Sequence, residues 1–183
     1  MISRAIAVIL LILLLPLCCV IISIILVEDG YPFIFVQKRI GYNKFFFNIY
    51  KFRTMKTYTP NMSTNLFKNE NNFILKSGII IRKLSLDEIP NLLNIIKGEM
   101  KFIGPRPAIP SQKKLIESRL ALGIYNLYPG ITGLAQVNGR DNLNDDEKVY
   151  FEKKYLANKS IILNFKIIVL TIIRIFKFNS VKH

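Results

Sequence analysis

The hydrophobic pattern divides the chain into an apolar N-terminal run and a longer, mixed remainder. From Ala5 to Val27 only Pro16 and Ser23 interrupt a continuous series of apolar residues. A helix of this length is long enough to cross a hydrocarbon core of about 30 Å. The run is longer than the apolar region of a signal peptide, and VEDGYP after it has no small-residue cleavage site. We therefore expect a membrane segment that remains in the mature protein.

Pro16 lies near the middle of this run. A proline inside a helix removes one backbone hydrogen bond, and its ring clashes with the preceding turn. A break or a kink is therefore expected at this position. Two arrangements fit the pattern: a kinked single span, and a bent helix that enters and leaves the same leaflet. The residues alone leave both open.

Two β-type segments follow the apolar run. FIFVQ and KFFFNIYKF are rich in aromatic and β-branched residues, and the turn at Gly41 to Asn43 between them predicts a pair of short strands. After them, residues 57–72 are polar, rich in Asn and Thr, and without a sustained period. This composition predicts a surface loop.

Helical periodicity dominates the second half of the chain. Its clearest instance is a set of apolar residues at the spacing of one helix face: Ile89, Leu92, Leu93 and Ile96. Gly98 is suited to end this helix. KKLIESRLALGIY and DDEKVYFEKKYLAN predict two further helices, and the glycine-rich YPGITGLAQVNGR between them predicts a loop or a short strand. The acidic residues 145–147 are expected to begin the second of these helices and to take no part in chemistry.

The last segment, residues 161–178, is mostly apolar but carries three cations. Lys166, Arg174 and Lys177 fall on one side of a helical wheel. In a second membrane span these cations would be costly in hydrocarbon. The pattern therefore favours an amphipathic helix that lies in the membrane interface.

The charge balance narrows the range of partners. Lys and Arg number 26 against 12 Asp and Glu, which gives a formal net charge of +14. This charge indicates anionic partners, namely phospholipid head groups, phosphorylated substrates or nucleic acid. Basic residues also gather soon after the membrane segment, which places the domain on the cytoplasmic side. They are Lys38, Arg39, Lys44, Lys51, Arg53 and Lys56.

The scarcity of cysteine and histidine excludes several kinds of site. Cys18 and Cys19 both lie inside the apolar run, and His183 is the sole histidine. A zinc site, a disulfide scaffold, a Cys nucleophile and a His general base are therefore all disfavoured. Any chemistry must therefore rest on carboxylates and basic residues, with a hard metal ion as an optional addition.

The pair Asp87 and Glu88 is the first candidate for that chemistry. In LSLDEIPNLL, Ser85 and Glu88 have the spacing of a capping box, which would be a purely structural role. Pro90 argues against it, because with Asp87 as N-cap the proline falls in the first turn, where its missing N–H is tolerated. In either case both carboxylates lie at a helix N-terminus, which stabilises negative charge by ~0.3–1 kcal/mol. An ionised carboxylate there can act as a nucleophile or bind Mg²⁺.

Side chains suited to phosphate accompany this pair along the sequence. Arg82 shortly precedes it, and Arg106 is held between two prolines in GPRP. A guanidinium on a stiff loop can bind two phosphate oxygens at little ordering cost. The glycine-rich segment adds backbone N–H groups and three side-chain donors, Gln136, Asn138 and Arg140. An ordinary salt bridge for Arg106 and a simple turn for the glycines are the structural alternatives.

Five motifs in this order behind the apolar run resemble the bacterial sugar transferase family: FVQKRIG, IYKFRTM, RKLSLDE, NIIKGEMKFIGPRP and PGITGLAQVNGR. The resemblance covers residues 33–171, and the chain is similar to the small monotopic phosphoglycosyl transferases. It implies an α+β, membrane-associated fold, with residues 1–27 as a re-entrant membrane helix broken at the proline. Residues 28–183 then form a cytoplasm-facing catalytic domain, small and mainly helical, with short strands and interfacial amphipathic helices.

The reaction that this resemblance implies transfers a sugar phosphate from a UDP-sugar to undecaprenyl phosphate and releases UMP. It requires Mg²⁺ and begins glycan assembly at the cytoplasmic face of the bacterial inner membrane. By the same resemblance Asp87 is the nucleophile of a covalent intermediate, and Glu88 assists it in metal binding or proton handling. Lys51, Arg82 and Arg106 match cations that contact phosphate.

The chain also departs from the family pattern. Leu15 precedes Pro16 where a serine is usual, Asn164 replaces a common aspartate, and Leu134 replaces a common aromatic residue. These departures concern the helix break, the docking to the membrane and the shape of the pocket. They leave the implied reaction class unchanged.

A second hypothesis is a membrane-tethered basic binding or regulatory protein without catalysis. For such a protein Asp87 is dispensable, and binding to nucleic acid depends strongly on salt. A third is a retained fold without turnover. The transferase hypothesis instead assigns the positive charge to inner-membrane phospholipid and to phosphate groups, and it expects no nucleic-acid partner. A homo-oligomer is compatible with it.

Overall fold

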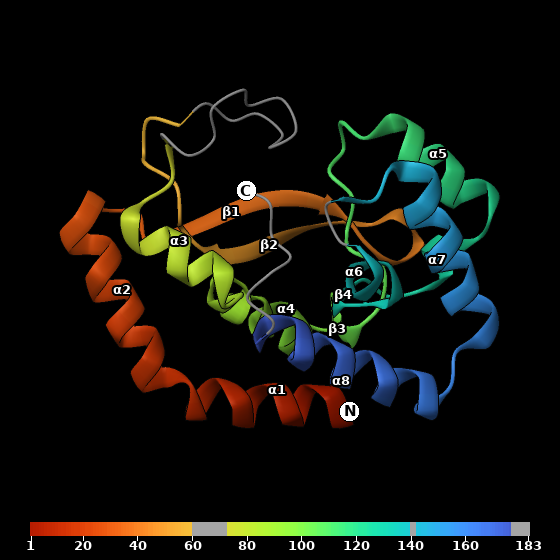
Figure 1. The fold of residues 1–183 in the computed structure, drawn as a ribbon, viewed down its shortest axis with the longest axis horizontal. Coiled ribbons are helices and arrows are strands. Elements are labelled where there is room, and N and C mark those ends of the chain that lie inside the picture. Colours follow the sequence, from red (N-terminus) through yellow and green to blue (C-terminus); the bar gives the residue numbers. More distant parts are fainter. Residues whose placement is uncertain (60–72, 140–141, 177–183) are drawn as a thin grey trace.

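The structure, a computed structural model, describes residues 1–59, 73–139 and 142–176. Figure 1 shows helices and short strands in a mixed arrangement, with the β1–β2 ribbon crossing the middle of the molecule. The α-helices are α1 (Ile2–Leu13), α2 (Leu15–Asp29), α3 (Lys76–Lys83), α4 (Leu92–Lys97), α5 (Lys113–Ala121), α6 (Leu134–Asn138), α7 (Asp145–Asn158) and α8 (Ile161–Phe176). The strands are β1 (Ile34–Ile40), β2 (Phe46–Phe52), β3 (Lys101–Ile103) and β4 (Gly130–Thr132). The predicted α+β class, mainly helical with short strands, is confirmed.

The apolar N-terminal run forms two helices. The axes of α1 and α2 differ by 60°, and the break between them falls at Leu14. Pro16 stands in the first turn of α2, where its missing N–H costs no intrahelical bond. No single helix in the described ranges has the length and apolar composition to cross a membrane, whereas the bent pair taken together has both. The predicted break near Pro16 is confirmed, with Leu15 before the proline.

The predicted strand pair is also confirmed. β1 and β2 pair antiparallel, with Arg39 opposite Phe47 and Phe35 opposite Lys51. The short 3₁₀ helix η1 (Tyr42–Lys44) forms the turn between them. Of the loop predicted after these strands, residues 60–72 lie outside the described residues.

The helix predicted around Ile89 and Leu92 is divided. A 3₁₀ helix, η4 (Leu86–Asn91), precedes the short α4, and Gly98 ends α4 with a φ of 85°, as predicted. Pro90 lies inside η4 and supplies no N–H to an α-helical ladder. Because a 3₁₀ helix has 3.0 residues per turn, the buried face shifts, so that Ile95 is buried and Leu93 is exposed. The predicted apolar face is therefore confirmed for Ile89, Leu92 and Ile96, which pack in the core, and wrong for Leu93.

The remaining elements follow the pattern closely, with one exception. The helix predicted from DDEKVYFEKKYLAN is α7, and its first turn is a capping box in which Asn144 and Glu147 bond reciprocally. The apolar C-terminal segment is α8, described as far as Phe176. The exception is α6, because residues 134–138 of the glycine-rich segment form a short helix where only a loop or a strand was predicted.

Both N-terminal helices take part in the core of the domain. Ala7 of α1 is buried against β2 and α4, and Ile21 and Ile25 of α2 are buried against residues of β2 and α3. Two further clusters lie around α5 and α7 and around α6 and α8. The apolar run is thus packed onto the rest of the chain along one face, while many of its other side chains are exposed.

Two carboxylates fix the C-terminal end of α2 to the domain. Glu28 accepts hydrogen bonds from the backbone N–H groups of Lys76 and Ser77, at 2.5 and 3.2 Å, and so caps the N-terminus of α3. Asp29 accepts from the Arg53 guanidinium and from the Thr57 N–H. The α2 helix is therefore joined to the segment that follows β2 and to the start of α3.

Replacing Glu28 with Ala is expected to lower the free energy of unfolding by about 1 kcal/mol, the usual cost of a lost N-terminal cap. Burial raises the pKa of Glu28, but the hydrogen bonds from Ser77 and Lys76 outweigh it and hold that pKa below its ordinary value of 4.5. The contribution is therefore present above pH 4.5 and is lost as the pH falls through the lowered pKa.

The measurement is thermal unfolding in detergent between pH 3 and pH 7. The matched control is Glu117→Ala, which removes an exposed glutamate of α5. Equal losses in the two variants at neutral pH would contradict the capping role of Glu28.

Candidate active site

The Asp87–Glu88 pair lies in the first turn of η4, and both residues are buried. Ser85 immediately before this helix adopts a left-handed conformation, with a φ of 55°. Its side chain makes no capping hydrogen bond, and Asp87 lies inside η4 rather than at its N-cap. Neither predicted capping arrangement is therefore present. Glu88 turns instead toward the cations of β2 and of the loop after β3. The purely structural interpretation, in which Ser85 and Glu88 form a capping box, is therefore wrong.

Lys51 of β2 joins the two carboxylates. Its ammonium lies 3.1 Å from Asp87 Oδ2 and 2.7 Å from Glu88 Oε1. The three side chains are only 7–15% exposed. Strand alternation explains the position of Lys51, since Phe47 and Ile49 on the same face of β2 are buried in the core.

Arg106 supplies a second cation from the GPRP loop. Its guanidinium donates to Glu88 Oε1 at 3.2 Å and keeps 34% of the side chain exposed. The loop is held in place because the Gly104 N–H donates to Thr132 O and the Gly130 N–H donates to Pro105 O. At Gly104 a Cβ would come within 2.1 Å of the Tyr128 carbonyl oxygen, so only glycine permits this approach. The site thus combines two anions and two cations from three segments.

The other predicted binding residues have different environments. Arg82, in the last turn of α3, donates from Nε to the Thr54 hydroxyl at 2.8 Å. Gln136 is buried, and its amide nitrogen lies 3.4 Å from Gly104 O at the base of the GPRP loop. Asn138 is exposed, and its amide donates within α6 to Leu134 O. Arg140 lies outside the described residues.

A small pocket opens beside the Glu88 carboxylate. Its lining contains both charged or polar and apolar residues: Arg39, Ile49, Lys51, Glu88, Asn91, Met100, Arg106, Pro107, Gly130 and Ile131. Arg39 and Asn91 are functional candidates that the sequence analysis missed. Arg39 could have been found from alternation, because it lies on β1 two positions from Gln37 and directly opposite Phe47, on the face that carries Lys51.

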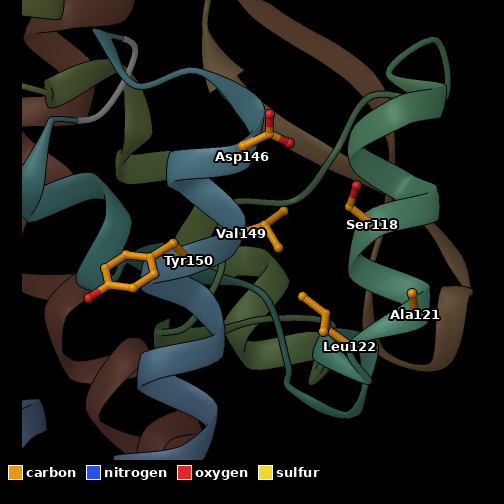
Figure 2. Close-up of a pocket in the computed structure, with 6 residues that line it drawn as sticks. All are labelled: Ser118, Ala121, Leu122, Asp146, Val149 and Tyr150. Atoms are coloured by element: carbon orange, nitrogen blue, oxygen red, sulfur yellow. The ribbon is translucent and has the colours of Figure 1, made fainter.

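A larger and more open depression lies between α5 and α7. Figure 2 shows Val149 of α7 and Leu122 directed into the gap between the two helices. A buried ion pair, in which Arg119 donates twice to Glu152, joins the same two helices. None of the predicted site residues that the structure describes lines this depression. We place the chemistry at the smaller pocket, where buried charges of both signs converge.

Two residues that differ from the family pattern, Asn164 and Leu134, are accommodated around α8. Asn164 accepts a hydrogen bond of 2.8 Å from the Tyr155 hydroxyl and so ties α8 to α7. An aspartate at this position would accept the same bond. Leu134 is partly buried in the cluster that contains Tyr155 and Ile167. Both residues therefore serve the packing of α6, α7 and α8.

The donor set at the dyad suits Mg²⁺ only together with a substrate. Within the described residues no group of three His, Cys, Asp or Glu side chains is arranged to hold a metal ion. Mg²⁺ commonly binds through one or two carboxylates and completes its six ligands with water and substrate phosphates. Asp87 and Glu88 fit that pattern.

The arrangement as a whole suits nucleophilic attack on an anionic substrate. Lys51 and Arg106 balance the two negative charges of the dyad, so that an anion can approach Asp87 without meeting an uncompensated carboxylate. Cations this close to a nucleophilic carboxylate can also stabilise the charge that develops on a transferring phosphoryl group. Such an arrangement suits phosphoryl transfer.

Comparisons with known proteins agree with this chemistry. The sequence profile described as bacterial sugar transferase matches residues 1–178. The uncharacterized sugar transferase EpsL of Bacillus subtilis (strain 168) is 38% identical over 151 residues, which cover 82% of this chain and 73% of EpsL. The exopolysaccharide production protein ExoY of Rhizobium meliloti (strain 1021) is 34% identical over 173 residues, covering 86% of this chain and 76% of ExoY.

A longer relative is named for its reaction. The UDP-glucose:undecaprenyl-phosphate glucose-1-phosphate transferase of Escherichia coli (strain K12) is 33% identical over 167 residues, which cover 86% of this chain and 35% of that protein. The match therefore lies within one part of the longer protein and includes nearly all of this chain. With the profile match, the paired carboxylates and the cations around them, the chain belongs to the bacterial sugar transferase family.

Proposed function

We propose that this protein transfers a sugar 1-phosphate from a UDP-sugar to undecaprenyl phosphate and releases UMP, as the first lipid-linked step of glycan assembly. The observation that carries the proposal is the buried Asp87–Glu88 pair bridged by Lys51. The names of relatives support the substrate class, since one is an undecaprenyl-phosphate galactose phosphotransferase of Salmonella typhimurium (strain LT2) and another a glucose phosphotransferase.

The proposed reaction has two displacements at one phosphorus atom. A carboxylate oxygen of Asp87 forms a bond to the sugar-bearing phosphorus, and the bond from that phosphorus to the bridging oxygen breaks, so that UMP leaves with the electron pair. A phosphate oxygen of undecaprenyl phosphate then attacks the same phosphorus, and the Asp87 carboxylate leaves. Lys51 and Arg106 hold the phosphate oxygens during both displacements.

Mg²⁺ is proposed as the cofactor, held by Asp87 and Glu88 together with the phosphates of the donor. When bound, it supplies positive charge that polarises the phosphate oxygens and stabilises the leaving UMP. The need for this positive charge follows from the number of positive and negative charges at the site. Lys51 and Arg106 already compensate the dyad, so the two negative charges of a diphosphate call for a further divalent cation.

We place the protein at the cytoplasmic face of the bacterial inner membrane, with the α1–α2 pair bent back within one leaflet. Exposed apolar side chains support this placement. On α8 they include Ile161, Ile162, Phe165, Ile168 and Ile172. Both α1 and α8 run along the lower edge of the molecule in Figure 1. An undecaprenyl chain in the same leaflet then brings its phosphate to the level of the head groups.

The contact of α8 with lipid is testable with a single fluorophore, because the sequence contains no Trp. In Phe165→Trp, bromine on the acyl chains of phosphatidylglycerol vesicles is expected to quench the indole fluorescence by roughly half or more, since an interfacial helix buries its apolar face ~5–10 Å deep. The matched control is Tyr150→Trp, at a residue of α7 that is 61% exposed. Equal quenching in both variants would remove α8 from the interface.

The function itself is tested by UMP release from detergent-purified protein with Mg²⁺, over a panel of UDP-sugars, with and without undecaprenyl phosphate. The expected result is one equivalent of UMP per protein without the lipid, and sustained turnover with it for at least one sugar. Folded protein that releases no UMP with any sugar, yet binds nucleic acid in a salt-dependent way, would favour the binding-protein alternative.

A further inference from the structure

The GPRP loop is tied to its surroundings on both sides of Arg106. Before Arg106, the Gly104 N–H and the Pro105 carbonyl are bonded to residues of β4. After it, the carbonyls of Pro107 and Ala108 are bonded to β1. The backbone around Arg106 is therefore held between two strands that belong to different sheets.

Arg39 makes the side-chain bond on the β1 side. Its Nη1 donates to Pro107 O at 3.0 Å, while its Nη2 donates to Gln37 Oε1 at 2.5 Å. The next residue, Ile40, donates its N–H to Ala108 O at 3.0 Å. Gln37 thus orients the guanidinium, and the guanidinium fixes the carbonyl of the residue directly after Arg106.

A lysine would not reproduce this connection. The planar guanidinium presents several N–H groups at fixed angles, which allows one side chain to bond Gln37 and Pro107 in different directions. A lysine ammonium offers charge on a flexible stem, without that fixed geometry. The type of residue at position 39 therefore matters for position as well as for charge.

From these contacts we infer that Arg39 is a positioning residue of the transfer reaction: it acts through the Pro107 carbonyl to hold Arg106 where the guanidinium meets Glu88 and the transferring phosphate. The inference rests on the proposed function for its kinetic consequence. Arg106 keeps a third of its side chain exposed. Its placement therefore depends on the loop backbone more than on surrounding packing.

The kinetic test is a double-mutant cycle of Arg39→Gln and Arg106→Ala, measured as lipid-dependent UMP release. Misplacement of a reacting group by about 1 Å can cost on the order of 100-fold, so Arg39→Gln is expected to lower kcat by about 10- to 100-fold, with less than about a threefold change in KM for the donor. In the Arg106→Ala background, Arg39→Gln is expected to lower kcat by less than about threefold. Arg39→Lys should restore little of the loss.

The matched control is Lys38→Gln, which removes a cation of the same strand that lies over the exposed ring of Phe46. It is expected to leave kcat unchanged within about twofold. Equal losses from Arg39→Gln in the two backgrounds would overturn the inference, because they would mean that Arg39 acts on the substrate independently of Arg106. Should Arg39→Gln not fold, Gln37→Met frees the same guanidinium and is expected to act in the same direction.

A second readout is independent of activity. Hydrogen exchange of the Ile40 amide, which bonds Ala108 O, is expected to quicken by about tenfold or more in Arg39→Gln, because the adjoining tie of the loop is lost. The Gly104 amide, bonded to Thr132 O, should exchange as in the wild type. Unchanged exchange at Ile40 would overturn the positioning role. Protein that shows this local change but no transfer with any sugar would instead contradict the proposed function.

Discussion

Asp87→Asn is expected to abolish both the release of UMP without lipid and the turnover with it, by a factor of about 10⁴ or more. An amide oxygen is a far weaker nucleophile than a carboxylate, so the first displacement fails. The replacement has almost the same shape, and its amide oxygen can still accept the hydrogen bond that Lys51 donates at 3.1 Å. The folded state should therefore persist.

Three measurements check this expectation together. Rapid-quench kinetics records the UMP burst, mass spectrometry of the peptide containing residue 87 records the phosphosugar adduct, and thermal unfolding records the fold. The control is Asp146→Asn, at an exposed aspartate of α7 whose partner is Lys114 at 3.5 Å. Undiminished UMP release in Asp87→Asn would remove Asp87 from the nucleophile role. Lipid-dependent release in the wild type without any burst would favour direct transfer between the two substrates.

Much of the fold could be predicted from local patterns in the sequence. The strands β1 and β2, the capping box of α7 and the end of α4 at Gly98 each depend on residues that are neighbours in the sequence. The helix around Pro90 was harder, since the same apolar spacing suits an α-helix and a 3₁₀ helix followed by an α-helix. The helix α6 was missed because Gly133 and Gly139 on either side of it suggested a loop.

The site was predictable only in part, because its geometry depends on contacts between distant segments. Asp87, Glu88, Lys51 and Arg106 were identified in the sequence, and the structure brings them together. That Lys51 contacts both carboxylates follows from the packing of β2 against η4. The part played by Arg39 depends on a hydrogen bond to a residue 68 positions away in the chain. No periodicity reveals such a bond.

The cations also explain how the protein places two adjacent carboxylates in a buried site that is proposed to bind phosphates. Two unpaired negative charges there would repel each other and the substrate. Lys51 contacts both carboxylates, and Arg106 contacts Glu88 from the GPRP loop. The positive charge of the chain is thus arranged in two ways: as a diffuse excess suited to anionic lipid, and as a few fixed contacts at the dyad.

Lys51→Met is expected to lower the transfer rate by about 10²- to 10³-fold, comparable to the loss of one preorganised charge at a transition state. Methionine keeps the length of the stem but removes the ammonium that lies 3.1 Å from Asp87 and 2.7 Å from Glu88. The two carboxylates are left buried without their shared partner. Breaking such a contact typically lowers the free energy of unfolding by about 3–5 kcal/mol.

The matched control is Lys97→Met, at a lysine that lies over the ring of Tyr50, the neighbour of Lys51 on β2. It is expected to leave the transfer rate nearly unchanged. A second variant separates stability from catalysis. Adding Glu88→Gln to Lys51→Met removes one of the two buried negative charges that Lys51 contacted, so the midpoint of thermal unfolding should recover while the rate stays low. Recovery of both the unfolding midpoint and the transfer rate would mean that Lys51 only supports the fold. Recovery of neither would mean that repulsion within the dyad is not the cause of the lost stability.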